Sequence, residues 1–193
     1  DKVLISVGRR PVMEGYGLEA LNLVQENRRL MVNAFMQTSH PRIYAVGDIT
    51  GHSMLAHTAI REGEVAVNHM VGKQDTMRYD TVPSVVYTNP EVAAVGLTEE
   101  EAAAQGLLVR VIKLPMAYSG RFVAENEGGN GLLKLVVDEH DNVLGCHMLG
   151  NPASELIVTV GLAIERNLSL EDIKRVVFPH PTVGEIIHES LYV

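Results

Sequence analysis

Apolar residues in the second half of the chain gather in short runs that alternate with helical patterns. Runs rich in β-branched residues lie at residues 85–86, 109–114, 132–137 and 143–149, and residues 138–142 between the last two predict a hairpin turn. Thr98 and Glu101 form a capping-box pattern that predicts a helix over residues 99–105. This alternation predicts an α+β fold, an antiparallel sheet flanked by helices.

Helical patterns also occupy the C-terminal part of the chain. A helix is expected after Asn151 and Pro152, because these residues are typical of a helix start. Its apolar face over residues 156–164 fits either a buried core or a subunit surface, since periodicity does not separate the two. Further helix starts are expected at Ser169 and near Thr182.

The first half of the chain has a different order of elements. Residues 3–7 form an apolar run that predicts a buried strand, and residues 43–46 predict a second short strand. Gly47 and Asp48 close this second strand, and helical spacing then continues over residues 54–71. The pattern therefore predicts a strand, a Gly-Asp turn and a helix in succession.

A polar run at residues 74–80 separates these two patterns and marks the expected domain boundary. We expect one unit over residues 1–78 and another over residues 79–193. Because the chain begins at Asp1 and enters an apolar run directly, we also expect it to be an interior segment of a longer protein.

Composition narrows the classes of function. The 193 residues, 46% hydrophobic and 21% charged, are typical of a globular protein. A net charge of −8 without a basic stripe argues against a nucleic-acid partner. The longest apolar stretch, residues 156–164, is about half of the roughly 20 residues that a membrane span needs, so no membrane partner is expected. The single Cys146 excludes an internal disulfide, and we expect it to be buried.

The first candidate for chemistry is the Gly-Asp turn with the helix start behind it. Asp48 can accept hydrogen bonds from sugar-like hydroxyls, and Gly47 lets a ligand approach the backbone. A helix start supplies free amides and the positive end of the helix dipole, here at Met54, Leu55, Ala56 and His57. These groups fit a polar, partly anionic cofactor, but the same residues also fit an ordinary turn and core positions.

The second candidate is the histidine-carboxylate pair His180 and Glu185. A carboxylate that accepts a hydrogen bond from one imidazole nitrogen makes the other nitrogen a better proton acceptor. The pair therefore fits a general base, and it equally fits a surface capping contact. His57, His147 and His188 have no metal-ligand spacing, so no metal site is expected.

Taken together, the segments resemble one family, the flavin-dependent pyridine nucleotide-disulfide oxidoreductases. Residues 3–11 are similar to the segment that leaves the NAD domain of that family, and residues 43–48 with 54–57 are similar to its second FAD motif. Residues 82–99 resemble the opening of its interface domain, and residues 180–185 resemble its histidine-glutamate motif. The order and spacing of these segments cover nearly the whole chain.

The resemblance implies a role for each matching residue. The turn at Gly47 and Asp48 would contact FAD together with Met54, Leu55, Ala56 and His57, and Gly8 would lie beside the nicotinamide of NAD. His180 would be the base, with Glu185 orienting it. The first unit would be the C-terminal part of the FAD- and NAD-binding region, and the second the dimerisation domain.

The resemblance also implies a substrate and partners. Residues 87–92 look closest to the branch that oxidises protein-bound dihydrolipoamide to lipoamide through a redox disulfide and FAD, with reduction of NAD. In this family the histidine serves the flavin and disulfide of the other subunit, so a homodimer is implied. The expected partner is the lipoyl domain of a 2-oxo acid dehydrogenase or related complex, in the cytoplasm or, in a eukaryote, in the mitochondrial matrix.

Departures from the family pattern leave alternatives open. The redox-active CxxxxC pair and the first GxGxxG fingerprint have no counterpart in this sequence, so we expect the isolated chain to be inactive and to bind FAD weakly at best. Residues 178–181 read Phe-Pro-His-Pro where many relatives have His-x-His-Pro, and Ser119 opens a stretch where relatives often have Asn-x-Arg-Ala. The alternatives are another disulfide reductase of the family and a non-catalytic dimerisation module.

Overall fold

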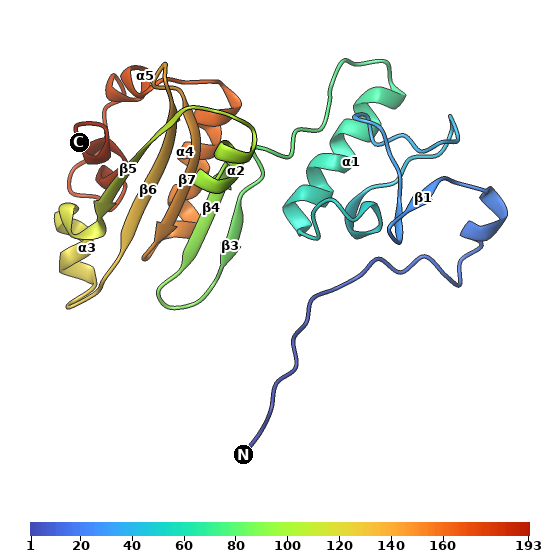
Figure 1. Ribbon diagram of the computed structural model, residues 1–193, viewed down its shortest axis with the longest axis horizontal. Helices are drawn as coiled ribbons and strands as arrows, with labels where there is room; N and C mark the ends of the chain where they lie inside the picture. Colours follow the sequence, from blue (N-terminus) through green and yellow to red (C-terminus); the bar gives the residue numbers. More distant parts are fainter. The chain divides into compact units, whose positions relative to one another are not determined.

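A computed structural model describes residues 1–193 and divides the chain into two units, Asp1–Arg78 and Tyr79–Val193. The second unit is organised by a five-stranded sheet in which every neighbouring pair is antiparallel (Figure 1). Its strands, in spatial order, are β3 (Ser84–Val86), β4 (Val92–Gly96), β7 (Val143–Leu149), β6 (Leu132–Asp138) and β5 (Val109–Pro115). The predicted α+β fold class is confirmed.

One face of this sheet carries the core of the second unit. Apolar side chains form two rows across four strands, Ala93–Met148–Leu133–Leu114 and Val95–Cys146–Leu135–Ile112. All of them are buried, and they pack in one cluster with residues of α4 (Ala153–Glu165) and α6 (Glu185–Ser190). Since strand side chains alternate between the two faces of a sheet, this register directs every second side chain of these strands into the core.

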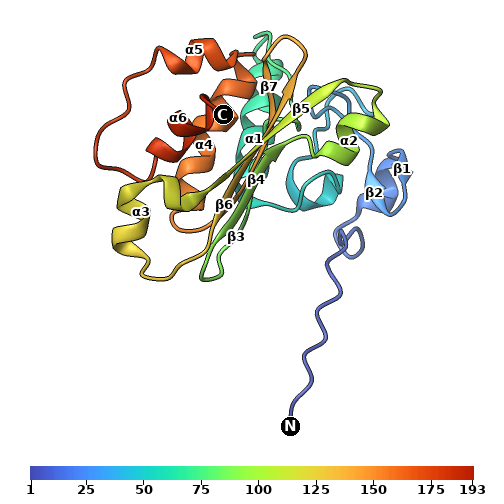
Figure 2. The same ribbon diagram turned by 60° about the vertical axis from the view of Figure 1, so that its left-hand side comes forward.

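The opposite face of the sheet is polar near its middle. His147 on β7 lies beside Ala94 on β4 and Lys134 on β6, and Lys134 lies beside Lys113 on β5. Glu99, the first residue of α2 (Glu99–Ala104), pairs with Lys113 at 3.4 Å and with Lys134 at 3.3 Å. Figure 2 shows α2 on one side of the sheet and α4 with α6 on the other.

Three short helices in the second unit, α2, α3 (Gly120–Glu125) and α5 (Leu170–Lys174), begin at side-chain caps. Thr98 and Glu101 form the predicted capping box at the start of α2, and Ser169 and Asp172 form another at α5. Ser119 caps α3, which follows the 3₁₀ helix η3 (Met116–Tyr118). These bonds satisfy helix amides that have no partner within the helix.

The start of α4 differs from the sequence prediction. No side chain of Asn151 or Pro152 caps this helix. Instead, the carboxylate of Glu91 accepts a hydrogen bond from the backbone N–H of Ser154 at 2.9 Å, and Asn151 accepts one from the backbone N–H of Glu91 at 2.9 Å. The cap comes from a residue about sixty positions away, which no local pattern reveals.

The first unit has little regular structure apart from one helix, α1 (Ala56–Met70). A two-residue hairpin joins β1 (Gln25–Glu26) to β2 (Arg29–Leu30), and 3₁₀ helices lie at η1 (Leu18–Leu21) and η2 (Gly47–Thr50). A small core forms from Leu18, Leu23, Leu30 and Ala45. No helix of the described chain has the length and apolarity that crossing a bilayer requires.

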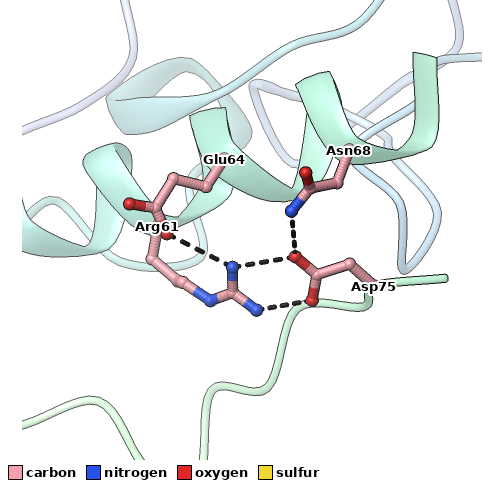
Figure 3. A network of polar contacts seen from close by, with 4 residues as sticks. All are labelled: Arg61, Glu64, Asn68 and Asp75. Atoms are coloured by element: carbon pink, nitrogen blue, oxygen red, sulfur yellow. Dashed lines mark hydrogen bonds and ion pairs between the residues drawn. The ribbon is translucent and has the colours of Figure 1, made fainter. Parts of the chain in front are cut away.

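The segment after α1 is held on that helix by a polar network (Figure 3). Arg61 donates two hydrogen bonds to the carboxylate of Asp75, at 2.9 and 2.5 Å, and Asn68 donates a third at 2.7 Å. The bonds from Arg61 and Asn68 hold the pKa of Asp75 below its usual range. Met77 is buried, and its backbone N–H bonds to Ala34. The first part of the polar run, residues 74–77, is therefore bonded to the first unit.

Two predicted strands are wrong. Residues 3–7 are extended but unpaired, and Val3, Leu4, Ile5 and Val7 are 79% to 92% exposed. No other part of the 193 residues pairs with this run, so its apolar residues have nothing to be buried against. Residues 43–46 form only an isolated bridge at Tyr44. Their backbone groups instead form hydrogen bonds within a loop. For example, the backbone N–H of Ala45 donates to the carbonyl of Met36 at 3.0 Å.

One strand and one helix boundary were also missed by the sequence analysis. β4 lies inside the sheet but reads Val-Ala-Ala-Val-Gly, and alanine and glycine are poor indicators of a strand. The helix expected near Thr182 begins three residues later, at Glu185. Both differences follow from tertiary contacts, which override local preference in short elements.

Close backbone approach makes Gly145 a sensitive position in the sheet. A Cβ at Gly145 would overlap the carbonyl oxygen of Leu97, whereas a Cβ at Gly161 on α4 would make an ordinary contact of 3.7 Å with Val95. We expect Gly145→Ala to lower the free energy of unfolding by about 3 kcal/mol or more. Gly161→Ala, the matched control, should raise it by about 0.5–1 kcal/mol, because alanine favours the helix. Urea unfolding of the two variants measures both changes, and equal stabilities would contradict this packing.

Candidate functional site

His180 and Glu185 lie in contact at the C-terminal end of the second unit. The Nδ1 atom of His180 is 2.8 Å from Oε1 of Glu185. His180 lies in the loop before α6, and Glu185 is the first residue of that helix. The imidazole is 81% exposed and the carboxylate 21% exposed, so the pair presents the ring outward and keeps its orienting group close to the protein.

Backbone and side-chain bonds hold the carboxylate and the loop in place. The second carboxylate oxygen of Glu185 accepts the backbone N–H of Thr182 at 2.8 Å. The hydroxyl of Thr182 donates to the carbonyl of Pro179 at 2.8 Å. Ser119 is buried, and its hydroxyl donates to the carbonyl of Thr182 at 3.1 Å. Sequence reasoning missed Ser119 as a support, because it lies 63 residues away from Thr182.

The electrostatics of the pair favour an ionised carboxylate. The backbone N–H of Thr182, and after it His180, hold the pKa of Glu185 below its ordinary value. A carboxylate accepts hydrogen bonds only, so Nδ1 of His180 carries the proton in this contact. In the neutral ring, Nε2 is then the acceptor, and the exposed ring can take a proton from a donor outside the chain.

A second histidine lies one turn further along α6. The ring of His188 is 5.3 Å from that of Phe178 and 5.2 Å from that of Tyr192, and Lys174 lies over the Tyr192 ring at 4.9 Å. His188 also contributes to the lowered pKa of Glu185. Through Phe178, these ring contacts support the loop that carries His180.

The Gly-Asp turn lies in the first unit, within η2. Gly47 has a φ of 79°, a left-handed conformation that favours glycine, and it is buried. Its backbone N–H donates to the carboxylate of Glu62 at 2.5 Å, and its carbonyl accepts the hydroxyl of Thr50 at 2.9 Å. Asp48 is exposed, and its carboxylate makes no hydrogen bond within the chain.

The predicted helix-start residues follow this turn and extend into the first turn of α1. Met54 and Leu55 precede the helix and are partly buried, whereas Ala56 and His57 begin it and are exposed. No side chain caps the first turn of α1. An exposed carboxylate next to a helix start without a side-chain cap fits a ligand that has both hydroxyl and anionic groups, as FAD does.

The remaining candidates do not join either cluster. Gly8 has a φ of 97° in the extended N-terminal segment and has nothing within 4 Å of the position a Cβ would take. Cys146 is fully buried, and burial raises the pKa of its thiol, so it is not a reactive thiolate. His180 and the Gly47–Asp48 turn lie in different units of the chain.

Comparison with known families places both units in one family. The model described as the pyridine nucleotide-disulphide oxidoreductase dimerisation domain matches residues 82–191. The model described as pyridine nucleotide-disulphide oxidoreductase matches residues 1–63. The first match contains His180 and Glu185, and the second contains Gly8, Gly47, Asp48 and the start of α1.

Curated relatives agree with these matches. Dihydrolipoyl dehydrogenase from Thermus scotoductus is 45% identical over 192 residues, covering 98% of this chain and 41% of the relative. The enzyme of the same name from Geobacillus stearothermophilus is 42% identical with the same coverage. The mitochondrial one from Homo sapiens is 41% identical, covering 98% of this chain and 38% of the relative. The chain thus spans about two fifths of the length of these relatives.

Solved structures share the fold. The crystal structure of LpdA from Mycobacterium tuberculosis superposes with a TM-score of 0.89 at 28% identity, covering 98% of this chain and 42% of that one. The HOCl-induced flavoprotein disulfide reductase RclA from Escherichia coli superposes with a TM-score of 0.82 at 25% identity, covering 96% and 43%. The resemblance inferred from the sequence motifs is confirmed.

The lowered pKa of Glu185 generates a pH-dependent prediction. A carboxyl whose pKa is lower in the folded state adds stability above its unfolded pKa, here about 4.5, and that contribution is lost as pH falls through the folded pKa. We expect Glu185→Gln to lower the free energy of unfolding at pH 7, with the difference from the unsubstituted chain disappearing in acid. Urea unfolding at several pH values measures this.

Glu189→Gln is the matched control, because it removes the same charge from an exposed position on the same helix. It should not show this pH-dependent difference. A constant difference between the Glu185→Gln and unsubstituted chains from neutral to acid pH would show that the Thr182 and His180 contacts do not favour the ionised carboxylate.

Proposed function

Because the chain belongs to the pyridine nucleotide-disulphide oxidoreductase family, we propose that it is the C-terminal part of a dihydrolipoyl dehydrogenase. The observation that carries the proposal is the 2.8 Å contact between His180 Nδ1 and Glu185, with the rest of the imidazole exposed. The 41% to 45% identity to dihydrolipoyl dehydrogenases along nearly the whole chain supports the substrate class.

In the intact enzyme, we propose, a redox disulfide oxidises dihydrolipoamide to lipoamide, and the two electrons end on NAD⁺ as part of a hydride. Oxidation of the dithiol to lipoamide releases two electrons and two protons. NADH keeps both electrons and one proton, and the second proton is released to solvent. The only cysteine of the chain is the buried Cys146, so the redox disulfide must come from outside these 193 residues.

His180 is the proposed base of this reaction. A thiol attacks a disulfide as its thiolate, so the proton on the attacking dihydrolipoyl sulfur must be removed first. Nε2 of His180 takes that proton, while Glu185 keeps Nδ1 protonated and stabilises the imidazolium that forms. In the reverse direction the imidazolium returns the proton. Thr182 and Ser119 orient the pair through Glu185 and the loop backbone.

The proposed cofactor contacts lie in the first unit. We propose that the exposed Asp48 would accept hydrogen bonds from FAD hydroxyls. The start of α1, from Met54 and Leu55 to Ala56 and His57, would contact the flavin ring. Gly47 would allow FAD to approach the backbone closely. Gly8 is the proposed neighbour of the nicotinamide of NAD. FAD, when bound, relays electrons between the disulfide and NAD⁺.

The match to a dimerisation domain supports a homodimer, in which we propose that His180 of one subunit acts at the flavin and disulfide of the other. The lipoyl domain of a 2-oxo acid dehydrogenase or related complex is the proposed partner that delivers the dithiol. We propose the cytoplasm as the compartment, or the mitochondrial matrix in a eukaryote, as the bacterial and mitochondrial relatives support.

A second candidate is another disulfide reductase of the same family. The observation that favours it is the similarity to RclA, a flavoprotein disulfide reductase, at a TM-score of 0.82. Comparing NAD⁺ reduction by dihydrolipoamide with NAD(P)H oxidation by glutathione disulfide separates the two reactions. A flavin-loaded dimer that turns over neither would favour the non-catalytic module.

Replacing the proposed base tests the mechanism. In the intact enzyme, His180→Gln should lower turnover of dihydrolipoamide by about 10²-fold or more, because glutamine cannot accept the thiol proton. His140→Gln is the matched control, since His140 is an exposed histidine on the hairpin between β6 and β7. Steady-state NADH formation measures both. Undiminished activity of His180→Gln would remove His180 from the mechanism.

The isolated 193-residue chain provides a further test. We expect it to show no dihydrolipoamide turnover, because it has no redox disulfide, and no stoichiometric FAD at micromolar concentration. Visible absorbance of the purified chain after incubation with FAD and removal of the unbound cofactor measures this. A yellow protein with one FAD per chain would show that these residues contain the complete flavin site.

A further inference from the structure

The side chain of Glu62 is the most deeply buried acidic group in the chain. It lies on the inward face of α1 and has no exposed surface. A carboxylate withdrawn from water in this way is costly unless hydrogen bonds compensate for the lost hydration. Sequence reasoning gave Glu62 no role, and a helix position of this kind ordinarily takes an apolar residue.

Glu62 is bonded to the Gly-Asp turn. Its Oε2 atom accepts the backbone N–H of Gly47 at 2.5 Å, across fifteen residues of sequence. The carbonyl of the same glycine accepts the hydroxyl of Thr50, which is also fully buried. Both polar backbone groups of Gly47 therefore have a buried side chain as a hydrogen-bond partner.

The turn also lies directly against α1. A Cβ added at Gly47 would meet the Cβ of Ala59 at 3.4 Å, and Ala59 is one turn before Glu62 on the same helix. Side chains on a helix point back toward its N-terminus, so the side chain of Glu62, in the second turn of α1, reaches the Gly47 turn. Near the turn, burial lowers the pKa of His52, Arg29 lowers it further, and Glu62 raises it.

From this geometry we infer that Glu62 is a positioning residue for the flavin site. Its carboxylate fixes the Gly47 turn to α1 and so sets where the adjacent, exposed Asp48 stands relative to the start of that helix. Asp48 and the helix start are the proposed FAD contacts, so the inference rests on the proposed function. A charge-assisted hydrogen bond is strong enough for this role, since it is shorter and about twice as strong as a neutral one.

The test uses the intact FAD-containing enzyme, with affinity for FAD measured by titrating the apoprotein and following flavin fluorescence. Glu62→Met removes the acceptor while keeping the length of the side chain, and it should raise the Kd for FAD at least tenfold, equivalent to about 1.4 kcal/mol. Glu62→Gln keeps an oxygen that can accept the Gly47 N–H and should stay within about threefold. Glu64→Met, an exposed glutamate on the same helix, is the matched control and should leave the Kd unchanged.

A double-variant cycle separates positioning from general support of the fold. If Glu62 acts through Asp48, then Glu62→Met should have little further effect in an Asp48→Ala background. If the fold-changes in the Kd for FAD of the two single variants multiply in the double variant, the inference is overturned, because Glu62 then acts independently of Asp48. The visible spectrum of the bound flavin is a second readout, and it should change in Glu62→Met but not in Glu64→Met.

The outcomes also distinguish this inference from the proposed function. If Asp48→Ala weakens FAD binding and Glu62→Met does not, the positioning role is wrong and the flavin site stands. If neither variant weakens FAD binding, the proposed flavin site is itself wrong. Should Glu62→Met fail to fold, Thr50→Val provides the same test, because it removes the other clamp on Gly47 with little change in volume; the inference predicts a higher Kd for FAD, and an unchanged Kd would overturn it.

Discussion

Burial of one face of the five-stranded sheet under α4 and α6 is the constraint on which the second unit depends. The two apolar rows fix the register of four strands, and this register fixes where α6 lies. Glu185 begins α6, so the position of the carboxylate, and through it that of His180, is set by core packing. The packing of the buried core therefore orients the exposed imidazole of His180.

The first unit reaches a similar result by different means. It has a small apolar core and few regular elements, so its turns are held by individual polar bonds. The carboxylate of Glu62 holds Gly47, and that of Asp75 holds the segment after α1 through Arg61 and Asn68. Glu62 accepts a bond from a backbone N–H, whereas Asp75 accepts bonds from two side chains of α1.

The sequence predicted those features that depend on local patterns. The α+β class, four of the five strands of the large sheet, the long helix α1 and the capping box at Thr98 follow from periodicity and cap residues. The motifs also indicated the family. Features set by distant contacts were missed: the Glu91 bond that caps α4, the Ser119 bond that holds Thr182, and the buried Glu62. The predicted strand at residues 3–7 was wrong for the opposite reason. The local pattern for a strand is present, but no strand of the chain pairs with it.

The unpaired apolar run at residues 3–7 also affects the tendency of the chain to aggregate. Val3, Leu4, Ile5 and Val7 have high β-propensity and are almost fully exposed, with open backbone groups on both edges. Such a segment is a template for intermolecular strand addition and for cross-β aggregation. Lys2 on one side and Arg9 and Arg10 on the other act as gatekeepers, because their like charges repel a second copy that approaches in register. Colloidal stability of the separate chain therefore depends on ionic strength, since salt screens these few cations.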